Sequence, residues 1–444
     1  MRDDLDVLIA DRVGARMDKG RWPGLALAIE HKGTTNSRVF GLADLEHETP
    51  VQPKTVFRIG SVTKPFTATL ILKLQEMGML LVEDKVAQHL PDLPSHYHAI
   101  TIHQLLTHTS GLPSYSTLPE FRRRIREDLS QAEVLALIKN LPLRFEPGTE
   151  HEYCNSGYNL LGLIAEQVTG HPYEEAINEH VLQRLGLDHT TYDSTSRIIP
   201  NRASGYVWDG EGNQNAPYLS MGLPGAAGGL VSTVGDLLKW QRSLGDGGFL
   251  STQSIAMMRN PTVLSTGEEI PYAYGMGLFE FEGQLKLRHG GGINGFSSIV
   301  TSYPTRDLAI AVLTNIGTGW DLWAVESEIA RLVLDLPTPA SPPVIQLSEE
   351  RLGAIAGTYL LGDAPVPATK KGGGIMWMGF HYLPIDNSTF VAAEDPESWM
   401  TFDAREVDSP RLTRRAQPLP PNPDGRPQLL RITREGVNYV YRSG

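Results

Sequence analysis

Cysteine, positive charge and long apolar runs are all scarce in this sequence. Cys154 is the single cysteine among 444 residues, which excludes an internal disulfide framework and a cysteine-based zinc site. The formal net charge of -12 provides no basic surface for nucleic acid or for an anionic membrane. No apolar stretch approaches the roughly 18 residues that a membrane-spanning helix needs. We therefore expect a protein with neither nucleic-acid nor membrane partners.

The composition is that of an ordinary globular protein, with 41% hydrophobic and 20% charged residues. A chain of this length predicts two or three domains. Residues 1–5 lack the basic start and the apolar run of a secretory signal. We expect a cytoplasmic protein, or a periplasmic one if a signal segment has been removed.

Helical and strand-like patterns follow one another over the first three quarters of the chain. The segment after Ser61 has helical spacing, and this helix should begin near Ser61 because Pro65 is tolerated only in a first turn. Other predicted helices are Arg2–Lys19, Ala132–Leu141, Ser156–Thr169, Tyr173–Leu185 and Asp321–Leu336. Predicted strands are Leu25–Glu30, a second one ending near Phe40, Tyr274–Phe281, Gln284–His289, Gly295–Ser302 and Leu308–Thr314. This order predicts an antiparallel sheet flanked by helices, with an inserted helical region.

The composition changes at a proline-rich run near residue 336. Beyond it, Leu429–Thr433 and Val437–Arg442 resemble strands, and Glu435-Gly436 between them is typical of a hairpin turn. We predict one domain over 1–336, a linker over 337–344 and a small β-barrel domain over 345–444.

Ser61-Val-Thr-Lys64 is the first of three candidate catalytic motifs. Three residues apart at a helix start, the hydroxyl and the ammonium group lie on one face, close to unpaired backbone N–H groups. Such a hydroxyl can pass its proton to a base, and the N–H groups can hold an oxyanion. Roughly one such match is expected by chance, and a solvated lysine in a first helical turn explains it equally well.

Tyr153-Cys-Asn155 is the second motif. A phenol is a usable base only beside a cation such as Lys64, because its ordinary pKa is near ~10. The Asn155 amide can bond both the lysine and a substrate carbonyl. The structural alternative is a buried tyrosine followed by a helix-capping asparagine, since a helix is predicted from Ser156.

His289-Gly-Gly-Gly292 is the third motif and lies between two predicted strands. Glycines here let a substrate lie along the strand edge, and one N–H can complete an oxyanion hole. Gly290–Gly295 also matches a dinucleotide-binding pattern, but a strand follows where that pattern needs a helix. A glycine-rich hairpin turn is the structural alternative.

In this order and spacing, the three motifs resemble those of the penicillin-recognising serine hydrolases, which include peptidase family S12. The family comprises class C β-lactamases, DD-carboxypeptidases, family VIII esterases and D-aminopeptidases. The resemblance covers about residues 5–335 and extends to the segments Gly41–Ser61, Leu105–Pro113 and Gly228–Asp236. It implies an α/β (α+β) chain with the β-lactamase/transpeptidase-like fold. It also implies acyl transfer without a metal or an organic cofactor.

The resemblance further implies a role for each matching residue. Ser61 would be the acylated nucleophile, Lys64 would lower its proton affinity, and Tyr153 would take the proton and later activate water. Which of Lys64 and Tyr153 is the true base is disputed for such sites. The backbone N–H groups of Ser61 and Gly292 would form the oxyanion hole. The implied substrate-binding residues are Asn155, His289, Gly290 and Gly291.

His289 stands where β-lactamases have the lysine of K-T-G, whose cation and hydroxyl meet the drug carboxylate. Loss of such polar contacts disfavours a β-lactamase. Histidine here, with Y-C-N and an appended barrel, is most similar to D-aminopeptidases and related S12 peptidases with a lipocalin-like C-terminal domain. We therefore expect a small amide or peptide substrate with a free amine, of D configuration, although no residue that would bind the amine is evident.

Other functions remain open at this stage. A family VIII-type carboxylesterase acting on a small ester is the alternative enzyme. A penicillin-binding sensor that is acylated without turnover is the competing class of protein. The sequence also leaves a homo-oligomer open.

Overall fold

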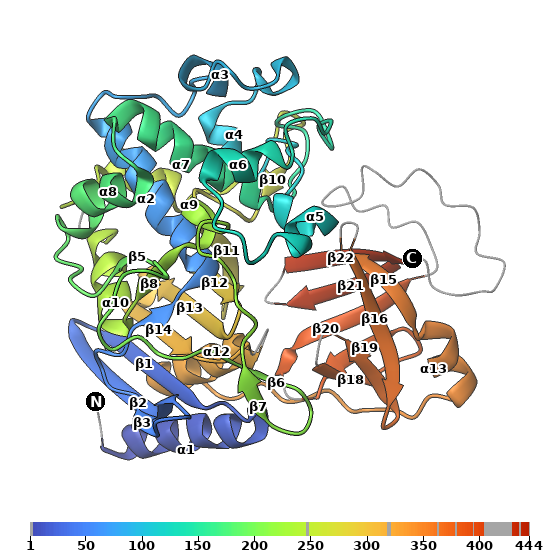
Figure 1. The fold of residues 1–444 in the computed structure, drawn as a ribbon. Coiled ribbons are helices and arrows are strands. Elements are labelled where there is room, and N and C mark those ends of the chain that lie inside the picture. The colour runs from blue at the N-terminus through green and yellow to red at the C-terminus, as the bar shows by residue number, and fades with distance from the viewer. Residues whose placement is uncertain are drawn as a thin grey trace. The chain divides into compact units, whose positions relative to one another are not determined.

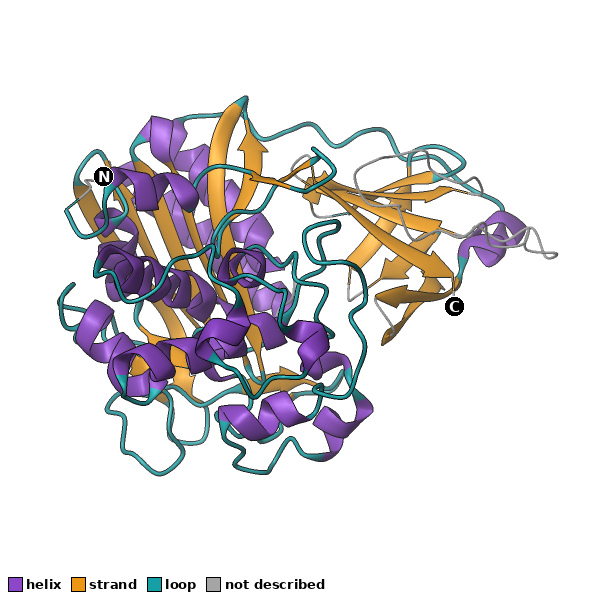
Figure 2. Cartoon of the chain, turned by 90° about the horizontal axis from the view of Figure 1, so that it is seen from above, coloured by secondary structure: helices purple, strands orange, loops and turns teal. Residues whose placement is uncertain are grey.

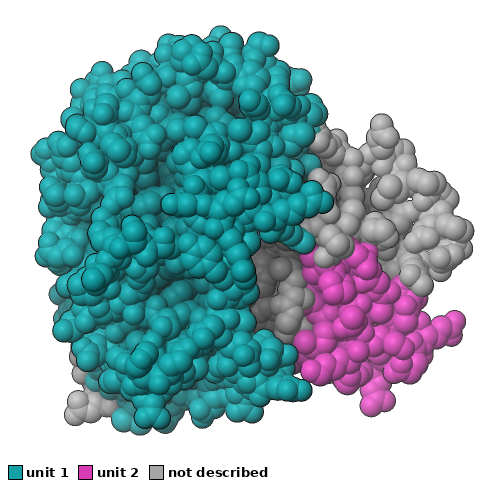
Figure 3. Space-filling model, in the orientation of Figure 1, with its two compact units in different colours: residues 1–278, 284–335 teal, residues 279–283, 336–444 magenta. Residues whose placement is uncertain are grey.

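The computed structural model describes residues 3–245, 248–317, 321–361, 364–377, 380–393, 395–403, 429–434 and 437–443 (Figure 1). The chain forms two compact units, shown in different colours in Figure 3. The first unit contains residues 1–278 and 284–335, and the second contains residues 279–283 and 336–444. The division after Asp335 falls beside the proline-rich run of the sequence.

A sheet with the strand order β11-β12-β13-β14-β1-β2-β3 organises the first unit (Figure 2). The neighbours from β12 to β3 pair antiparallel, as predicted. The strands are β1 (Gly24–His31), β2 (Thr34–Asp44), β3 (Thr49–Pro50), β11 (Gly277–Phe281), β12 (Gln284–Ile293), β13 (Phe296–Tyr303) and β14 (Leu308–Thr314). Shorter strands are β4 (Phe57–Arg58), β5 (Thr191–Tyr192), β6 (Tyr206–Trp208), β7 (Asn213–Asn215), β8 (Leu230–Ser232), β9 (Thr262–Val263) and β10 (Glu269–Ile270).

Helices supply the rest of this unit. The longer ones are α1 (Asp3–Gly20), α2 (Thr63–Glu76), α7 (Asn155–Thr169), α10 (Val234–Ser243) and α12 (Asp321–Leu334). The shorter helices are α3 (Val86–His89), α4 (Ile102–Leu106), α5 (Pro119–Arg123), α6 (Gln131–Ala136), α8 (Tyr173–Ile177), α9 (Gly225–Gly228) and α11 (Thr252–Met257). Single turns are η1 (Gly60–Val62), η2 (Ser95–Tyr97), η3 (Tyr115–Thr117), η4 (Asn178–Leu182) and η5 (Pro304–Arg306).

Helices cover both faces of the sheet, which explains why every residue of β13 is buried. On one face, the Tyr303 hydroxyl of β13 donates to Glu326 Oε1 of α12 at 2.7 Å. Val300 points to the opposite face, because neighbouring strand residues alternate. There it belongs to the same buried cluster as Trp240 of α10.

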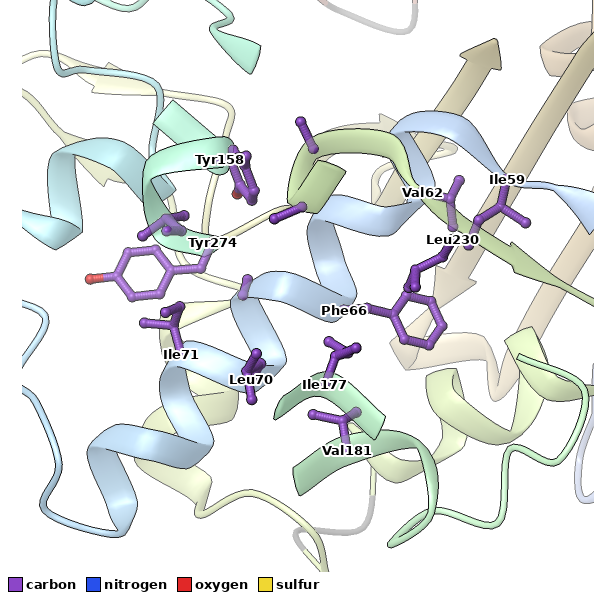
Figure 4. Close-up of a cluster of buried hydrophobic side chains, with 14 of the residues drawn as sticks. Ile59, Val62, Phe66, Leu70, Ile71, Tyr158, Ile177, Val181, Leu230 and Tyr274 are labelled. Atoms are coloured by element: carbon purple, nitrogen blue, oxygen red, sulfur yellow. The ribbon is translucent and has the colours of Figure 1, made fainter. Parts of the chain in front are cut away.

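α2 is a core helix of the first unit (Figure 4). It is buried from Thr63 to Leu72, so neighbouring elements must enclose it on all sides. Those neighbours include α7, α8, α9 and η4. Phe66 and Ile71 extend from it among side chains of the surrounding elements. The predicted helix start near Ser61 is confirmed, because η1 begins at Gly60 and continues directly into α2.

Several predicted elements differ in extent from the observed ones. β12 continues to Ile293, so the three glycines after His289 lie inside a paired strand and not in a hairpin turn. Antiparallel hydrogen bonds with β13 hold them extended despite their freedom as glycines. The helix predicted over 132–141 ends at Ala136, and the one over 173–185 changes to a π turn after Ile177.

The second unit contains a closed barrel in the order β15-β16-β17-β18-β19-β20-β21-β22. Its elements are α13 (Glu349–Ile355), β15 (Gly357–Leu361), β16 (Ala364–Lys371), β17 (Gly374–Trp377), β18 (Phe380–Pro384), β19 (Thr389–Ala392), β20 (Asp395–Asp403), β21 (Leu429–Arg434) and β22 (Val437–Ser443). Ile355, Tyr359, Trp377 and Phe390 form part of its core. The last two predicted strands are present and pair antiparallel, whereas the predicted turn at Glu435-Gly436 lies outside the described residues.

Two neighbouring glycines of β12 offer a test of this packing. A Cβ atom on Gly291 would lie 2.0 Å from the carbonyl oxygen of Ile59, whereas a Cβ on Gly292 would meet nothing within 4 Å. We predict that Gly291→Ala lowers the free energy of unfolding by about 1–3 kcal/mol, because backbone atoms must move. Gly292→Ala should lower the free energy of unfolding by much less, because a Cβ atom there meets nothing within 4 Å. Denaturant unfolding of both variants checks this, and equal stabilities would contradict the close approach.

Candidate active site

Ser61 lies in η1, which packs directly against β12. Gly60 has a φ of 47°, and a Cβ on it would lie 3.0 Å from the carbonyl oxygen of Gly292. Ser298 of β13 donates from its hydroxyl to the carbonyl oxygen of Ile59 at 2.6 Å and anchors the same segment. Glycine at position 60 therefore satisfies both an unusual backbone angle and a close approach. As a result, the segments that carry Ser61 and Gly292 are in contact.

Lys64 is completely buried beneath Ser61, one helical turn further along. Its Nζ donates to Ser61 Oγ at 3.2 Å, to Asn155 Oδ1 at 2.8 Å and to the carbonyl oxygen of Ala227 at 2.8 Å. Burial lowers the pKa of Lys64 well below its ordinary value, because the charged form loses its hydration. None of the acidic residues in the described part of the chain forms an ion pair with it. In its neutral form Lys64 keeps two N–H donors, for Asn155 Oδ1 and the Ala227 carbonyl oxygen, and its lone pair can accept a proton from Ser61 Oγ, 3.2 Å away.

Tyr153 covers the same lysine. The centre of its ring lies 4.7 Å from Lys64 Nζ, and its hydroxyl is hydrogen-bonded to the Ser61 side chain. Although 41% of the Tyr153 surface is exposed, protein atoms crowd the hydroxyl, and this desolvation raises the pKa of the phenol. Lys64 thus lies beside the phenol but does not bring the pKa of Tyr153 below its ordinary value. A phenolate base would require such a lowered pKa, so this expectation from the sequence is not met. Tyr153 is a neutral phenol in this structure.

Asn155 is the first residue of α7, and its side chain is oriented by two contacts. Its Oδ1 accepts from Lys64, and its Nδ2 donates to Ser116 Oγ at 2.9 Å. The helix cap is Cys154, so the Asn155 side chain is not a helix cap. Sequence reasoning missed Ser116, because a serine in the single turn η3 carries no distinctive pattern. The second Nδ2 hydrogen is left to reach a substrate carbonyl.

His289 is buried at the edge of this group, with its ring 6.3 Å from the Tyr153 ring. Its Nδ1 donates to the carbonyl oxygen of Gly290 at 2.8 Å, and its Nε2 lies 3.2 Å from the Tyr272 hydroxyl. Burial, with a smaller contribution from Lys64, lowers the pKa of His289 to about 3. His289 is therefore a neutral imidazole at physiological pH.

The glycines after His289 have different surroundings. A Cβ on Gly290 would lie 3.0 Å from Nε1 of Trp323, and one on Gly291 would strike Ile59. Packing thus accounts for glycine at these two positions, and substrate contact by either residue stays a prediction. The space beside Gly292 is open, as an oxyanion-binding position requires.

A metal centre finds no support in the part of the chain that the structure describes. There, no three His, Cys, Asp or Glu side chains are grouped so that they could hold a metal ion. Within the same residues, no helix has both the length and the apolar character to cross a membrane. The arrangement as a whole presents a hydroxyl, an amine of lowered pKa and a phenol around one open point, which suits nucleophilic acyl transfer.

The model of the Beta-lactamase family matches residues 9–334. Penicillin-binding protein 4* of Bacillus subtilis is 30% identical, over 78% of this chain and 81% of its own length. Protein flp of Staphylococcus aureus is 31% identical over 68% of this chain, and the match spans only 61% of the length of flp.

Solved structures show the same fold. A D-amino acid amidase from Ochrobactrum anthropi superimposes with a TM-score of 0.66 at 25% identity, over 75% of this chain and 99% of its own. EstCE1, a hydrolase with promiscuous acyltransferase activity, has a TM-score of 0.63 at 25% identity, over 73% of this chain and 98% of its own. The octameric penicillin-binding protein homologue of Pyrococcus abyssi covers 98% of this chain and 99% of its own, with a TM-score of 0.68 at 23% identity. The β-lactamase/transpeptidase-like fold expected from the sequence is confirmed.

The buried histidines predict how stability depends on pH. The pKa of His108 is well below its ordinary value, that of His151 is about 4 and that of His289 is about 3, in each case mainly through burial. The unfolded chain takes up protons first as the pH falls below ~6.5, so unfolding becomes easier. Between about pH 7 and pH 5, each of these histidines should remove up to about 2 kcal/mol of stability.

Denaturant unfolding at the two pH values measures this loss. In His151→Gln, the loss of stability between about pH 7 and pH 5 should be smaller by the contribution of one histidine, which is up to about 2 kcal/mol. His189→Gln, at an exposed position, is the comparison variant. A stability that is independent of pH over this range would contradict the burial of these groups.

Proposed function

The chain belongs to the beta-lactamase family, and on that premise we propose that it is a serine hydrolase that works through an acyl-Ser61 intermediate. The observation that carries the proposal is the state of Lys64, which is buried, lies with Nζ 3.2 Å from Ser61 Oγ and has a pKa well below its ordinary value. The lowered pKa favours the neutral amine, whose lone pair can take the serine proton.

In the proposed reaction, Ser61 Oγ attacks the substrate carbonyl while its proton passes to Lys64 Nζ. The N–H groups of Ser61 and Gly292 hold the resulting oxyanion. The oxyanion then collapses and the bond to the leaving group breaks. Tyr153 gives its phenol proton to the leaving group and receives the proton that Lys64 took, so Lys64 is again neutral and Tyr153 is again a phenol. Water attacks the acyl-Ser61 ester while Lys64 takes a proton from it, and Lys64 returns that proton to Ser61 Oγ as the acid leaves. In this proposal Lys64, and not Tyr153, is the general base, because the pKa of Lys64 is lowered whereas that of Tyr153 is raised.

The proposed substrate is a small amide or peptide of a D-amino acid. The motif Y-C-N with His289 supports this choice, as does the similarity to a D-amino acid amidase. A carboxylesterase is the second candidate, supported by the similarity to EstCE1 and by one feature of the site. Among the described residues, no Asp or Glu takes part in the hydrogen bonds or pKa shifts of Lys64, Tyr153 and His289. A substrate ammonium group would need such a carboxylate.

The other expectations of the sequence remain proposals. A β-lactamase is less favoured, because His289 replaces the K-T-G lysine with a neutral ring. A penicillin-binding sensor without turnover would use Lys64 for acylation only and would leave it without a role in deacylation. The division into two domains and a linker, the lipocalin-like character of the barrel, a homo-oligomer and a cytoplasmic or periplasmic location also stay predictions.

The first test concerns the nucleophile and its base. Ser61→Ala should abolish acylation by p-nitrophenyl butyrate, as measured by intact mass, with little change in melting temperature. Lys64→Arg should lower the acylation rate by about 10³-fold or more, because a guanidinium cannot give up its proton. Lys73→Arg on the same helix is the matched control and should behave like the wild type. Fast acylation of Lys64→Arg would remove Lys64 as the base.

The second test concerns the substrate. Hydrolysis of matched D- and L-alanine p-nitroanilides is compared with that of p-nitrophenyl butyrate and nitrocefin. A preference for the D-anilide of at least about tenfold, or about 1.4 kcal/mol in the barrier, is expected. Ester cleavage without anilide turnover would instead assign the chain to the esterases. Stable acylation by penicillin without turnover would favour the sensor.

A further inference from the structure

Lys64 binds the backbone of α9, and α9 depends on its neighbours for its position. Lys64 Nζ lies 2.8 Å from the carbonyl oxygen of Ala227. α9 consists only of glycine and alanine, and all of its residues are buried. A single helical turn is not stable by itself, and small side chains offer little apolar surface for packing. The place of the Ala227 carbonyl group must therefore be set by groups outside α9.

Thr67 of α2 holds the peptide group that precedes Ala227. The Thr67 hydroxyl donates to the carbonyl oxygen of Ala226 at 2.7 Å, which is shorter than the 3.3 Å between the same hydroxyl and the carbonyl oxygen of Thr63. The Tyr173 hydroxyl of α8 lies 2.7 Å from Thr67 Oγ1 and stabilises its position. Thr67 is completely buried, so bulk water does not compete for these contacts.

Asn159 of α7 holds the other end of the same peptide group. It lies one helical turn after Asn155, on the same face of α7. Its Oδ1 accepts from the N–H group of Ala227 at 3.3 Å, and its Nδ2 donates to the carbonyl oxygen of Leu223 at 3.2 Å. The Tyr115 hydroxyl is also hydrogen-bonded to the Asn159 side chain. A backbone N–H only donates and a backbone carbonyl only accepts, so these two partners set the orientation of the Asn159 amide.

Both acceptors that Lys64 contacts are therefore fixed by further hydrogen bonds. Asn155 Oδ1 is oriented by the contact of its amide with Ser116, and the Ala227 carbonyl group follows a peptide group that is bonded at both ends. A neutral amine has two N–H bonds and one lone pair in a tetrahedral arrangement. When two fixed acceptors take the N–H bonds, the lone pair is left to face Ser61 Oγ, 3.2 Å away.

We propose that Thr67 and Asn159 are positioning residues for Lys64. They hold the Ala227 carbonyl group so that the lone pair of the amine is directed at Ser61 Oγ. The inference rests on the proposed function, since it concerns the base of the same acyl transfer. Both residues act through the backbone of α9. A shift of this carbonyl group would leave the nucleophile in place and turn the base away from it, which lowers the acylation rate.

Acylation by p-nitrophenyl butyrate tests the role of Thr67. Thr67→Val removes the hydroxyl and keeps the shape of the side chain, so kcat/KM should fall about tenfold. Thr67→Ser keeps the hydroxyl and should stay within about twofold of the wild type. Thr69→Val is the matched control, because Thr69 is an equally buried threonine of α2 that bonds to Pro65 and Trp240 instead. It should lose a similar amount of stability in denaturant and keep the wild-type kcat/KM.

The same substitution in a variant without the amine separates positioning from a general structural effect. Lys64→Met has neither an N–H bond nor a lone pair at this place, so a displaced Ala227 carbonyl group has nothing to misdirect. In that background, Thr67→Val should change the acylation rate, followed by intact mass, by less than about twofold. An equal loss in both backgrounds would overturn the proposal. A Thr67→Val variant with the wild-type rate, or a Thr67→Ser variant as slow as Thr67→Val, would overturn it too.

Asn159→Ser gives an independent answer if Thr67→Val does not fold, because the shorter side chain does not reach the N–H group of Ala227. Its acylation rate should fall about tenfold in the wild-type background and by less than about twofold in Lys64→Met. If Lys64→Met acylates as fast as the wild type, the proposed function fails in its choice of base. A slow Lys64→Met together with fast Thr67→Val and Asn159→Ser variants would leave the proposed function standing and overturn this inference alone.

Discussion

The desolvation of Lys64 is the constraint on which the rest of this site depends. Placing an amine in a fully buried position is costly unless its hydrogens find acceptors. Ser61, Asn155 and Ala227 supply those acceptors, so one side chain ties η1, which packs against β12, to α7 and α9. None of these acceptors is a carboxylate, so no negative charge offsets the lost hydration of the ammonium group, and the pKa of Lys64 is lowered. Structural integrity and reactivity therefore have the same origin.

Close backbone packing places the nucleophile. Gly60 and Gly291 allow η1 and β12 to approach each other more closely than any side chain would permit. The same approach brings the N–H-bearing segments of Ser61 and Gly292 together, while the space beside Gly292 stays open. Gly290 and Gly291, which the sequence suggested as a substrate-binding edge, are thus explained by their close packing against Trp323 and Ile59.

Polar groups around the site are neutral to an unusual degree. Burial raises the pKa of Tyr153 and lowers the pKa values of Lys64 and His289, so each group favours its uncharged form. A neutral site suits a reaction whose charge appears only in the transition state, where the oxyanion forms.

The sequence by itself determined the elements with strong local signals. The spacing of Ser61 and Lys64 placed both on one helical face, and the strand patterns of 295–302 and 308–314 predicted the antiparallel sheet. Only the tertiary structure decided the partners of these residues. Ala227 lies 163 positions from Lys64, and Tyr272 lies 164 from His108, so no local periodicity links either pair. The glycine strand of β12 looked like a turn, because its extended form depends on pairing with β13. The protonation states of Lys64 and His289 were likewise beyond the sequence, since burial and hydrogen-bond direction arise only when distant segments meet.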